Sequence, residues 1–244
     1  MEANLTVISQ PRYLPALNYL QRLYFADTFI LLDTVQRQAR GWENRNKLFV
    51  NKQPSWVSIP IKSSSRALIK DTRISNAEWT EDHCSKITQN YKDSPFFDAD
   101  FITHCYSSIK HALKQNQFDF TTAMTELYRV TFDYLGLTFN IVRASELEEG
   151  AENVPPKGPE KLLWLCQKNN SSKYISGPNG AEYGIAEVFD AQNMLFAYHT
   201  YSPTAYAQSH SQTFEPYLGY FDALFNMGAD WLKAHIQEEP AIYQ

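Results

Sequence analysis

The first 33 residues contain the pattern that most strongly constrains the fold of this chain. Leu5–Ser9 is a short apolar run rich in strand-forming residues, and a proline-containing loop follows it. Apolar residues then recur at helical spacing, at Leu17, Leu20, Leu23 and Tyr24. The continuous apolar run Phe29–Leu32 is typical of a strand buried in a parallel sheet. We therefore expect a β-α-β unit, whose right-handed crossover puts the first loop and Asp33 at the same carboxyl edge.

Later segments extend this pattern to an α/β fold. Strands are expected at Trp56–Ile61, Leu68–Ile74, Thr138–Arg143, Lys173–Ser176 and Met194–Thr200. Helices are expected at Glu78–Tyr91, Phe97–Gln115, Phe118–Leu135, Glu160–Lys168 and Tyr217–Asn226. We predict one domain over residues 1–244, a Rossmann-like, mostly parallel sheet with flanking helices and a helical insertion at about 78–135. The polar stretch Glu146–Pro159 is expected to be a mobile active-site loop, with a linker as the alternative.

Composition and charge exclude several classes of protein. The 244 residues carry a formal net charge of −5, which argues against a dedicated nucleic-acid binder. No window approaches the roughly 18 uncharged apolar residues of a membrane span, and the first residues lack a signal-peptide pattern. The three cysteines are far apart, so we expect neither a disulfide nor a metal site and place the chain in a reduced cytoplasm.

The loop after the first strand is the first candidate site. It holds Gln10 and Tyr13, and it precedes a helix whose free N–H groups could meet an anion or a carbonyl oxygen. The alternative is a proline-stiffened turn with Tyr13 packed in the core. A glycine signature for phosphate binding is missing here, so both interpretations stay open.

A second candidate follows the apolar run Phe29–Leu32. Asp33 must face solvent, a partner or a ligand, because burying an unpaired carboxylate is costly. The nearby polar and aromatic residues are Gln36, Trp42, Asn44 and Arg45. Donors, acceptors and a flat apolar surface occur together in ligand pockets, which favours a binding site over an exposed hairpin with surface charges.

Two histidines could transfer protons. His83 shares a helix face with Tyr91, and its reference pKa near 6.5 suits acid–base chemistry at neutral pH. His199 lies at the end of an expected strand. For each, the alternative is a partly buried structural histidine.

Two weaker candidates lie near the end of the chain. Ser176-Gly177 follows an expected strand, and its backbone N–H groups could hold an oxyanion or phosphate, although a tight turn explains the same residues. Asp222 and Asn226 are one helical turn apart, and a surface helix face is the alternative.

Taken together, these segments resemble the WbqC-like protein family. The resemblance runs from about Val7 to Gly228 and is most specific near the start of the chain. It rests on Ser9–Pro15, Asp33–Gln36, Gly41–Asn46, Trp79 with His83 and Tyr91, Tyr174–Gly177, and Asp222 with Asn226. The opening motif of the family usually has His, Asn, Trp and Gly where this chain has Ser9, Arg12, Ala16 and Asn18. These differences indicate a shifted substrate.

The resemblance implies an acyl or aminoacyl (for example glycyl) transferase that forms an amide on an amino sugar or similar amine, in surface-polysaccharide or specialised-metabolite biosynthesis. The base would be His83, Asp33 or His199. The expected binding residues are Gln10, Tyr13, Gln36, Trp42, Asn44, Arg45, Tyr91, Ser176, Gly177, Asp222 and Asn226. The substrate would be a small molecule such as a nucleotide-linked amino sugar, with a CoA or acyl-carrier-protein thioester as donor and no cofactor assigned. A nucleotide-dependent ligase or nucleotidylyltransferase and a non-catalytic sugar- or peptide-binding module are the alternatives.

Overall fold

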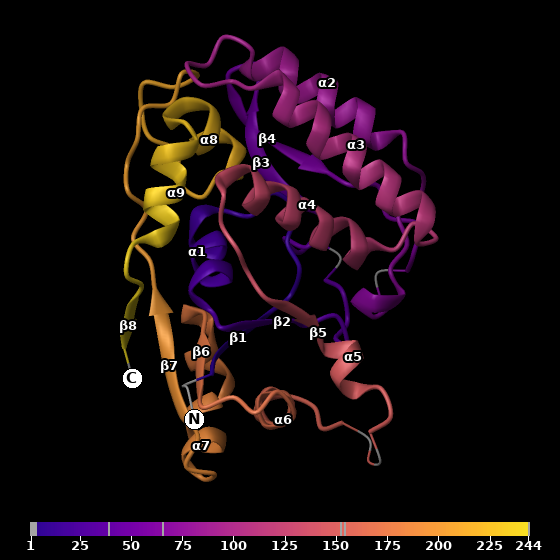
Figure 1. Ribbon diagram of the computed structural model, residues 1–244, viewed down its shortest axis with the longest axis vertical. Helices are drawn as coiled ribbons and strands as arrows, with labels where there is room; N and C mark the ends of the chain where they lie inside the picture. Colours follow the sequence, from indigo (N-terminus) through magenta and orange to yellow (C-terminus); the bar gives the residue numbers. More distant parts are fainter. Residues whose placement is uncertain (1–3, 39, 65, 152, 154, 244) are drawn as a thin grey trace.

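A six-stranded sheet forms the centre of the computed structural model, which describes every residue except 1–3, 39, 65, 152, 154 and 244 (Figure 1). Its strand order is β5-β2-β1-β6-β7-β8, and every neighbouring pair is parallel except β7 with β8. The strands are β1 (Leu5–Ser9), β2 (Thr28–Leu31), β5 (Ile141–Arg143), β6 (Lys173–Ser176), β7 (Leu195–Thr200) and β8 (Ala241–Tyr243). The predicted α/β fold with a mostly parallel sheet is confirmed.

The β-α-β unit at the start of the chain is present as β1, α1 (Leu17–Phe25) and β2. Val7 and Phe29 are paired in register and belong to the core on one face of the sheet. Ile8 and Ile30 are the next pair and belong to the core on the opposite face. Because both faces are buried, both strands need apolar side chains on both sides, which explains their continuous apolar sequences.

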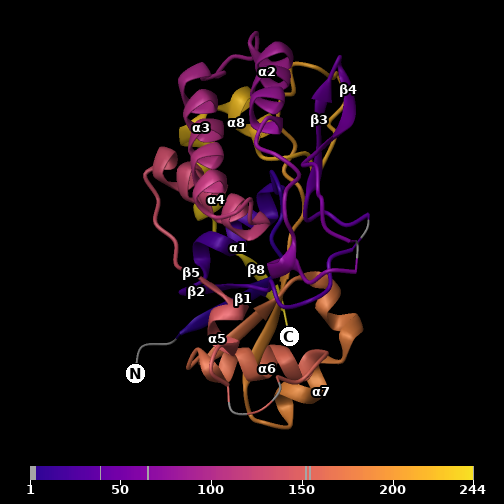
Figure 2. The same cartoon turned by 90° about the vertical axis from the view of Figure 1, so that its right-hand side faces the viewer.

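Helices cover both faces of the sheet (Figures 1 and 2). On one face, α1, α4 (Phe120–Leu135) and α9 (Ala229–Gln237) contribute side chains to the core that contains Val7. On the other face, α6 (Pro159–Lys168) and α7 (Ile185–Asp190) contribute side chains to the core that contains Ile8. The sheet therefore separates two hydrophobic cores.

The middle of the chain forms three helices, α2 (Trp79–Tyr91), α3 (Ala99–Gln115) and α4. Asp98 caps α3 by accepting a hydrogen bond from the Phe101 amide at 2.8 Å, and α4 ends at Gly136, whose φ is 60°. Leu113 of α3 belongs to the same buried cluster as Val7 of the sheet. These helices therefore share a core with the sheet. The helical insertion and the likeness to a Rossmann fold are not established by this arrangement. The single-domain assignment stays a prediction.

A β-hairpin follows the first unit. Its strands are β3 (Arg45–Val50) and β4 (Gln53–Ser58), joined at Asn51-Lys52, where both residues have positive φ (51° and 60°) as a two-residue hairpin turn requires. The strand expected at Trp56–Ile61 thus starts earlier than predicted, since this turn fixes its pairing. The prediction of a strand at Leu68–Ile74 is wrong. A 3-10 turn occupies Ile69–Asp71 there, because the Thr72 amide donates locally to the Ile69 carbonyl.

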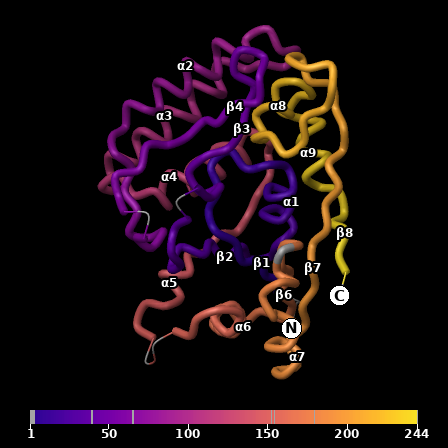
Figure 3. Tube along the Cα trace, turned by 180° about the vertical axis from the view of Figure 1, so that it is seen from behind, coloured from indigo at the N-terminus to yellow at the C-terminus, as the bar shows by residue number. Residues whose placement is uncertain are grey.

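The last third of the chain returns along one side of the molecule. Residues 201–219 form all but the last residue of the link from β7 to α8 (Phe221–Met227), and Figure 3 shows this segment running past the hairpin. α8 begins later than predicted because Tyr217 has a φ of 59°, which a helix does not accommodate. The predicted loop at 146–159 is partly wrong, since α5 (Ala144–Glu148) occupies its start, and residues 152 and 154 lie outside the described part.

Candidate functional site

The carboxyl ends of the parallel strands meet along one edge of the sheet. In open α/β sheets, ligands bind beyond this edge, where the strand order reverses direction. Here the order reverses at β1, since β2 and β5 lie on one side of it and β6 and β7 on the other. Gln10 and Asp33 both follow strands at this edge, where the Leu32 amide donates to the Ser9 carbonyl at 2.8 Å.

Asp33 is fully buried just beyond the end of β2. Its carboxylate accepts hydrogen bonds from the backbone amide of Ser145 at 2.9 Å and from the Ser145 hydroxyl at 2.7 Å. Burial raises the pKa of Asp33, and the two bonds from Ser145 partly oppose this rise. Asp33 is therefore a stronger base than a solvated aspartate, and the Ser145 hydroxyl is its immediate partner.

A polar pocket of about 470 Å³ lies beside this pair. It is lined by Lys70, Asp71, Arg73, Gln115, Asn116, Gln117, Asp119, Thr122, Arg143 and Ser145. Arg143 ends β5, and Ser145 is in the first turn of α5, so the pocket sits at the carboxyl edge of β2 and β5. We name this hollow the edge pocket.

Ion pairs hold the wall of the edge pocket in place. One Asp119 carboxylate oxygen accepts from Arg73 at 3.2 Å, and the other accepts from Arg143 at 3.3 Å. The second Arg143 nitrogen donates to the Thr122 hydroxyl at 2.8 Å. Asp119 also caps α4 through the Thr122 amide. The guanidinium groups are therefore positioned before any ligand arrives.

A third ion pair fixes α5 against the end of β2. Glu148 accepts hydrogen bonds from the Thr34 hydroxyl at 2.5 Å and from the Lys161 ammonium at 2.8 Å. Lys161 also donates to the Thr34 carbonyl at 3.3 Å. These contacts keep Ser145 within reach of Asp33.

On the other side of β1, Ser176 ends β6 and is buried, and Gly177 follows it. The Gly177 carbonyl accepts from the Gly180 amide at 3.0 Å, which closes a 3-10 turn over Pro178–Tyr183. Gln10 is half-buried at the same edge, and its carbonyl accepts from the Tyr19 hydroxyl. These three predicted binding residues therefore share one edge of the sheet.

Tyr13 and His83 lie together, away from the edge pocket. The Tyr13 hydroxyl is 2.7 Å from His83 Nδ1 and 2.6 Å from the Tyr106 hydroxyl, and the Trp79 ring packs edge-on against both Tyr13 and His83. Burial, with a smaller contribution from Lys86, lowers the pKa of His83 to about 4. This environment favours a packing role for His83.

His199 is fully buried in β7. Its Nε2 is 2.9 Å from the Gln21 side-chain oxygen, and its Nδ1 has no hydrogen-bond partner among the described residues. Burial, reinforced by Arg22, lowers the pKa of His199 to about 4. His199 is therefore neutral near pH 7.

The residues of the second candidate are used mainly to fold the loop before the hairpin. The Arg45 guanidinium stacks 4.2 Å from the Trp56 ring centre and donates to the carbonyls of Gly41 and Arg40 at 3.1 and 2.6 Å. Asn44 donates to the Ile59 carbonyl, and Trp42 packs against Trp56. Gln36 forms an isolated β-bridge with Leu68. None of these residues lines the edge pocket.

Asp222, Tyr91 and Asn226 form a separate buried network at α8. Asp222 accepts hydrogen bonds from the hydroxyls of Tyr91 and Tyr206 and from the Gln208 amide, each at 2.9 Å. Asn226 accepts from the Ser209 amide and hydroxyl. Burial raises the pKa of Asp222, and the three donors oppose the rise. This network ties the segment 201–219 to α8.

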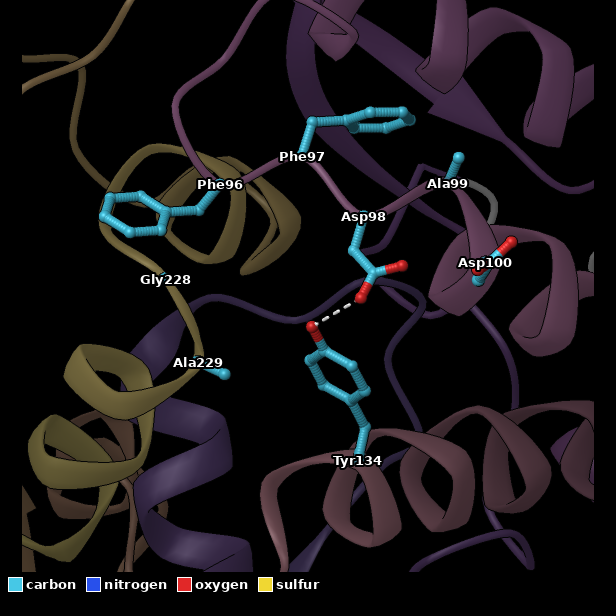
Figure 4. Close-up of a pocket in the computed structure, with 8 residues that line it drawn as sticks. All are labelled: Phe96, Phe97, Asp98, Ala99, Asp100, Tyr134, Gly228 and Ala229. Atoms are coloured by element: carbon cyan, nitrogen blue, oxygen red, sulfur yellow. Dashed lines mark hydrogen bonds between the residues drawn. The ribbon is translucent and has the colours of Figure 1, made fainter.

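A second hollow, of about 380 Å³, lies where α3 begins, between Phe96 and Tyr134 (Figure 4). The Tyr134 hydroxyl points at Asp98 and donates to it at 2.9 Å. Asp98 also caps α3. Since these polar groups satisfy one another, this hollow offers little to a ligand.

A comparison with known families identifies the chain. The sequence model of the WbqC-like protein family matches residues 10–234. The chain belongs to the WbqC-like protein family. An uncharacterized protein of Mycobacterium tuberculosis, Rv1507c, is 27% identical over 229 residues, which cover 91% of this chain and 94% of the relative. No solved structure matches the chain significantly.

Two further observations bear on partners of this WbqC-like protein. No helix in the described part of the chain is both long and apolar enough to cross a membrane. Within the same residues, no three His, Cys, Asp or Glu side chains are grouped closely enough to hold a metal ion.

The site residues expected from the sequence include none of those that line the edge pocket of this WbqC-like protein. The missed residues are Lys70, Asp71, Arg73, Gln115, Asn116, Gln117, Asp119, Thr122, Arg143 and Ser145. A signal was present for two of them, because Arg143 and Ser145 come at the end of an expected strand, as Asp33 does. The sequence does not show that these residues lie beside Asp33, because this depends on the strand order, which brings β5 next to β2.

Proposed function

We propose that this WbqC-like protein is a transferase that moves an acyl or aminoacyl group onto an amine of a small substrate bound in the edge pocket. The observation that carries this proposal is the contact between buried Asp33 and the Ser145 hydroxyl, which lines the pocket. A buried carboxylate with a raised pKa beside a polar pocket is typical of a catalytic base. Of the three bases expected from the sequence, the surroundings favour Asp33 over His83 and His199.

The reaction assigns one role to each group. The amine nitrogen attacks the carbonyl carbon of the donor, so that a C–N bond forms and the bond from that carbon to the leaving group breaks. The amine proton passes to the Ser145 oxygen while the Ser145 proton passes to Asp33, and the leaving group later takes up a proton. The guanidinium of Arg143 or Arg73 stabilises the oxyanion that develops on the donor carbonyl.

The substrate class in this proposal follows what the family resemblance implies. We take the acceptor to be an amino sugar, such as a nucleotide-linked one, and the donor to be a CoA or acyl-carrier-protein thioester. A glycyl or other aminoacyl donor fits the same chemistry. The setting would be surface-polysaccharide or specialised-metabolite biosynthesis.

Mass spectrometry of the acceptor tests this proposal. We expect the wild-type protein, given a panel of nucleotide-linked amino sugars and acyl or aminoacyl donors, to add one acyl mass to an acceptor. The D33N variant keeps an oxygen that can accept from the Ser145 amide, so it should fold but lose turnover roughly a hundredfold or more. D27N is the matched control, because Asp27 accepts the Leu5 amide at the opposite, amino edge of the sheet. Its turnover should equal that of the wild type.

The pH dependence of kcat/KM gives a second readout. Because the pKa of Asp33 is raised, the rate should fall at a higher pH than for an ordinary aspartate when the medium is acidified, and D33N should lack this step. Conversion of ATP to AMP and pyrophosphate would instead favour the nucleotide-dependent ligase. Binding of a sugar or peptide that is never converted, and that D33N retains, would favour the binding module.

A further inference from the structure

Arg22 is a buried cation on α1, at a position that a helix of this kind normally fills with an apolar side chain. Only 5% of Arg22 is exposed, and its neighbours Leu20 and Leu23 are in the core. Its one hydrogen bond among the described residues runs from Nε to the Asn18 carbonyl of its own helix, at 3.3 Å. Arg22 therefore has no acidic partner to offset the loss of its hydration.

A second guanidinium packs against the same aromatic ring as the first. The carbons at the centres of the Arg12 and Arg22 guanidinium groups are 5.8 and 5.7 Å from the same Tyr19 ring centre. Neither group forms an ion pair within the described residues. Burial, and after it the charge of Arg12, lowers the pKa of Arg22 to about 10. Two cations thus share one aromatic ring without a counter-charge.

The position of this pair in the fold indicates where the counter-charge comes from. Arg22 Nη1 is 2.7 Å from the place where a Cβ on Gly177 would stand, so only glycine leaves the room that the guanidinium occupies. Gly177 follows β6, and Arg12 lies in the loop after β1. The strand order of the sheet reverses between β1 and β6, which is the favoured binding position in open α/β sheets.

Packing alone does not account for the pair. Contact with an aromatic ring stabilises a cation modestly, whereas removing a charge from water without a partner is much more costly. An arginine that was needed only to fill space could be replaced by leucine or methionine at lower cost. A bound anion would offset the charge of both groups at once.

We propose that the chain binds a phosphoryl group of a small metabolite between the carboxyl ends of β1 and β6, held by the guanidinium groups of Arg22 and Arg12. Each planar guanidinium can donate two parallel hydrogen bonds to an oxyanion, and a phosphoryl group has enough oxygens for both. The half-buried side chain of Gln10, at the same edge, makes no hydrogen bond within the described residues and can add a donor. The inference goes beyond the proposed reaction, since such binding requires no acyl transfer.

Binding of pyrophosphate, measured by thermal-shift titration at constant ionic strength, tests the proposal without any turnover. We expect pyrophosphate to stabilise the wild-type protein. The R22Q variant should weaken the apparent affinity roughly ten- to hundredfold, because a hydrogen-bonded charge is lost. R22K keeps the charge but loses the planar fork, so its affinity should be intermediate. R12Q should also weaken binding, and since Arg12 is only half-buried this variant should fold even if R22Q does not.

The control is R129Q, which removes an equal charge from an exposed arginine already paired with Glu126 and Asp133 on α4. Its affinity for pyrophosphate should equal that of the wild type. Without added anion, R22Q should unfold at the same temperature as the wild type or at a higher one, since it removes an uncompensated buried charge.

Two results would overturn the proposal. The first is a wild-type protein that pyrophosphate does not stabilise, together with an R22Q variant that is less stable without any anion, because Arg22 would then be structural. The second is tighter binding of malonate than of pyrophosphate with the same loss in R22Q, because the site would then recognise carboxylates. Loss of acyl transfer in D33N with unchanged pyrophosphate binding would separate this site from the proposed reaction.

Discussion

Several ionisable side chains of this protein are buried with polar partners, and the partners decide what each one can do. Asp33 faces a hydroxyl that lines a pocket, which is the arrangement of a base. His83 faces Tyr13 within an aromatic cluster, which keeps its ring neutral and fixed. The sequence made both candidates for proton transfer, Asp33 from its place after an apolar strand and His83 from its helix face. It could not tell which of the two side chains lies beside a pocket.

The H83Q variant tests the role of His83 through stability. The folded-state pKa of His83 is about 4, below the unfolded value near 6.5, so the unfolded chain binds one more proton between these two pH values. The free energy of unfolding should therefore fall as the pH drops from 6.5 toward 4. H83Q should reduce this slope by up to about 1.4 kcal/mol per pH unit, measured by urea unfolding at several pH values.

His199 has a similarly lowered pKa, so part of the slope should remain in H83Q. H104Q, which replaces an exposed histidine on α3, is the matched control. If H83Q left the pH slope of the free energy of unfolding unchanged but greatly reduced turnover, His83 would be a proton-transfer residue.

At the scale of elements, strands and helices with strong periodicity could be predicted, and those defined by their neighbours could not. β6 lies at the predicted residues Lys173–Ser176 because both of its faces are buried. β8 was missed, since the three residues Ala241–Tyr243 are exposed and form an edge strand that pairs only with β7. The 3-10 turn at Ile69–Asp71 was mistaken for a strand, because the segment contains β-branched residues. Three residues are too few to show the periodicity that distinguishes a turn from a strand.

The D222N variant tests how residues 201–219 are held. Asparagine cannot accept all three hydrogen bonds that the Asp222 carboxylate receives, so at least one buried donor would lose its partner. We expect a loss of about 2 kcal/mol in the free energy of unfolding, measured by urea denaturation. Amide hydrogen exchange should become faster in residues 201–219 than elsewhere.

D230N, at an exposed aspartate in the first turn of α9, is the control. It should lower stability by only a few tenths of a kcal/mol, the usual scale for a charge near a helix end. A D222N variant as stable as the wild type would mean that the segment is held by its apolar contacts instead.

At the scale of the whole molecule, one sheet lies between two hydrophobic cores and contributes side chains to both. The core on the face covered by α1 contains Leu20, and the core on the face covered by α6 contains Leu165. The sequence indicated such an arrangement through its doubly buried strands. It did not indicate which helices share a face, because that depends on the strand order.

Alanine substitutions on the two faces test whether the sheet makes the molecule one cooperative unit. L20A and L165A each remove a fully buried side chain and should each lower the free energy of unfolding by about 2–5 kcal/mol. Their effects should add within about 0.5 kcal/mol, since the sheet separates the two sites. Calorimetry should show a single transition for each variant. Two separate transitions would mean that the two cores unfold independently and would contradict the single-domain assignment.

The central place of β1 also has a consequence for synthesis on the ribosome. β1 pairs with β2 as soon as both have emerged, but its other neighbour, β6, is translated only after all three middle helices. Until then one side of the central strand has unpaired backbone groups, which invite pairing with another nascent chain. α1 and the middle helices can shield only one face of the strand during this interval. Slow translation between β5 and β6 should therefore increase misfolding, and chaperone binding during this interval would protect the growing chain.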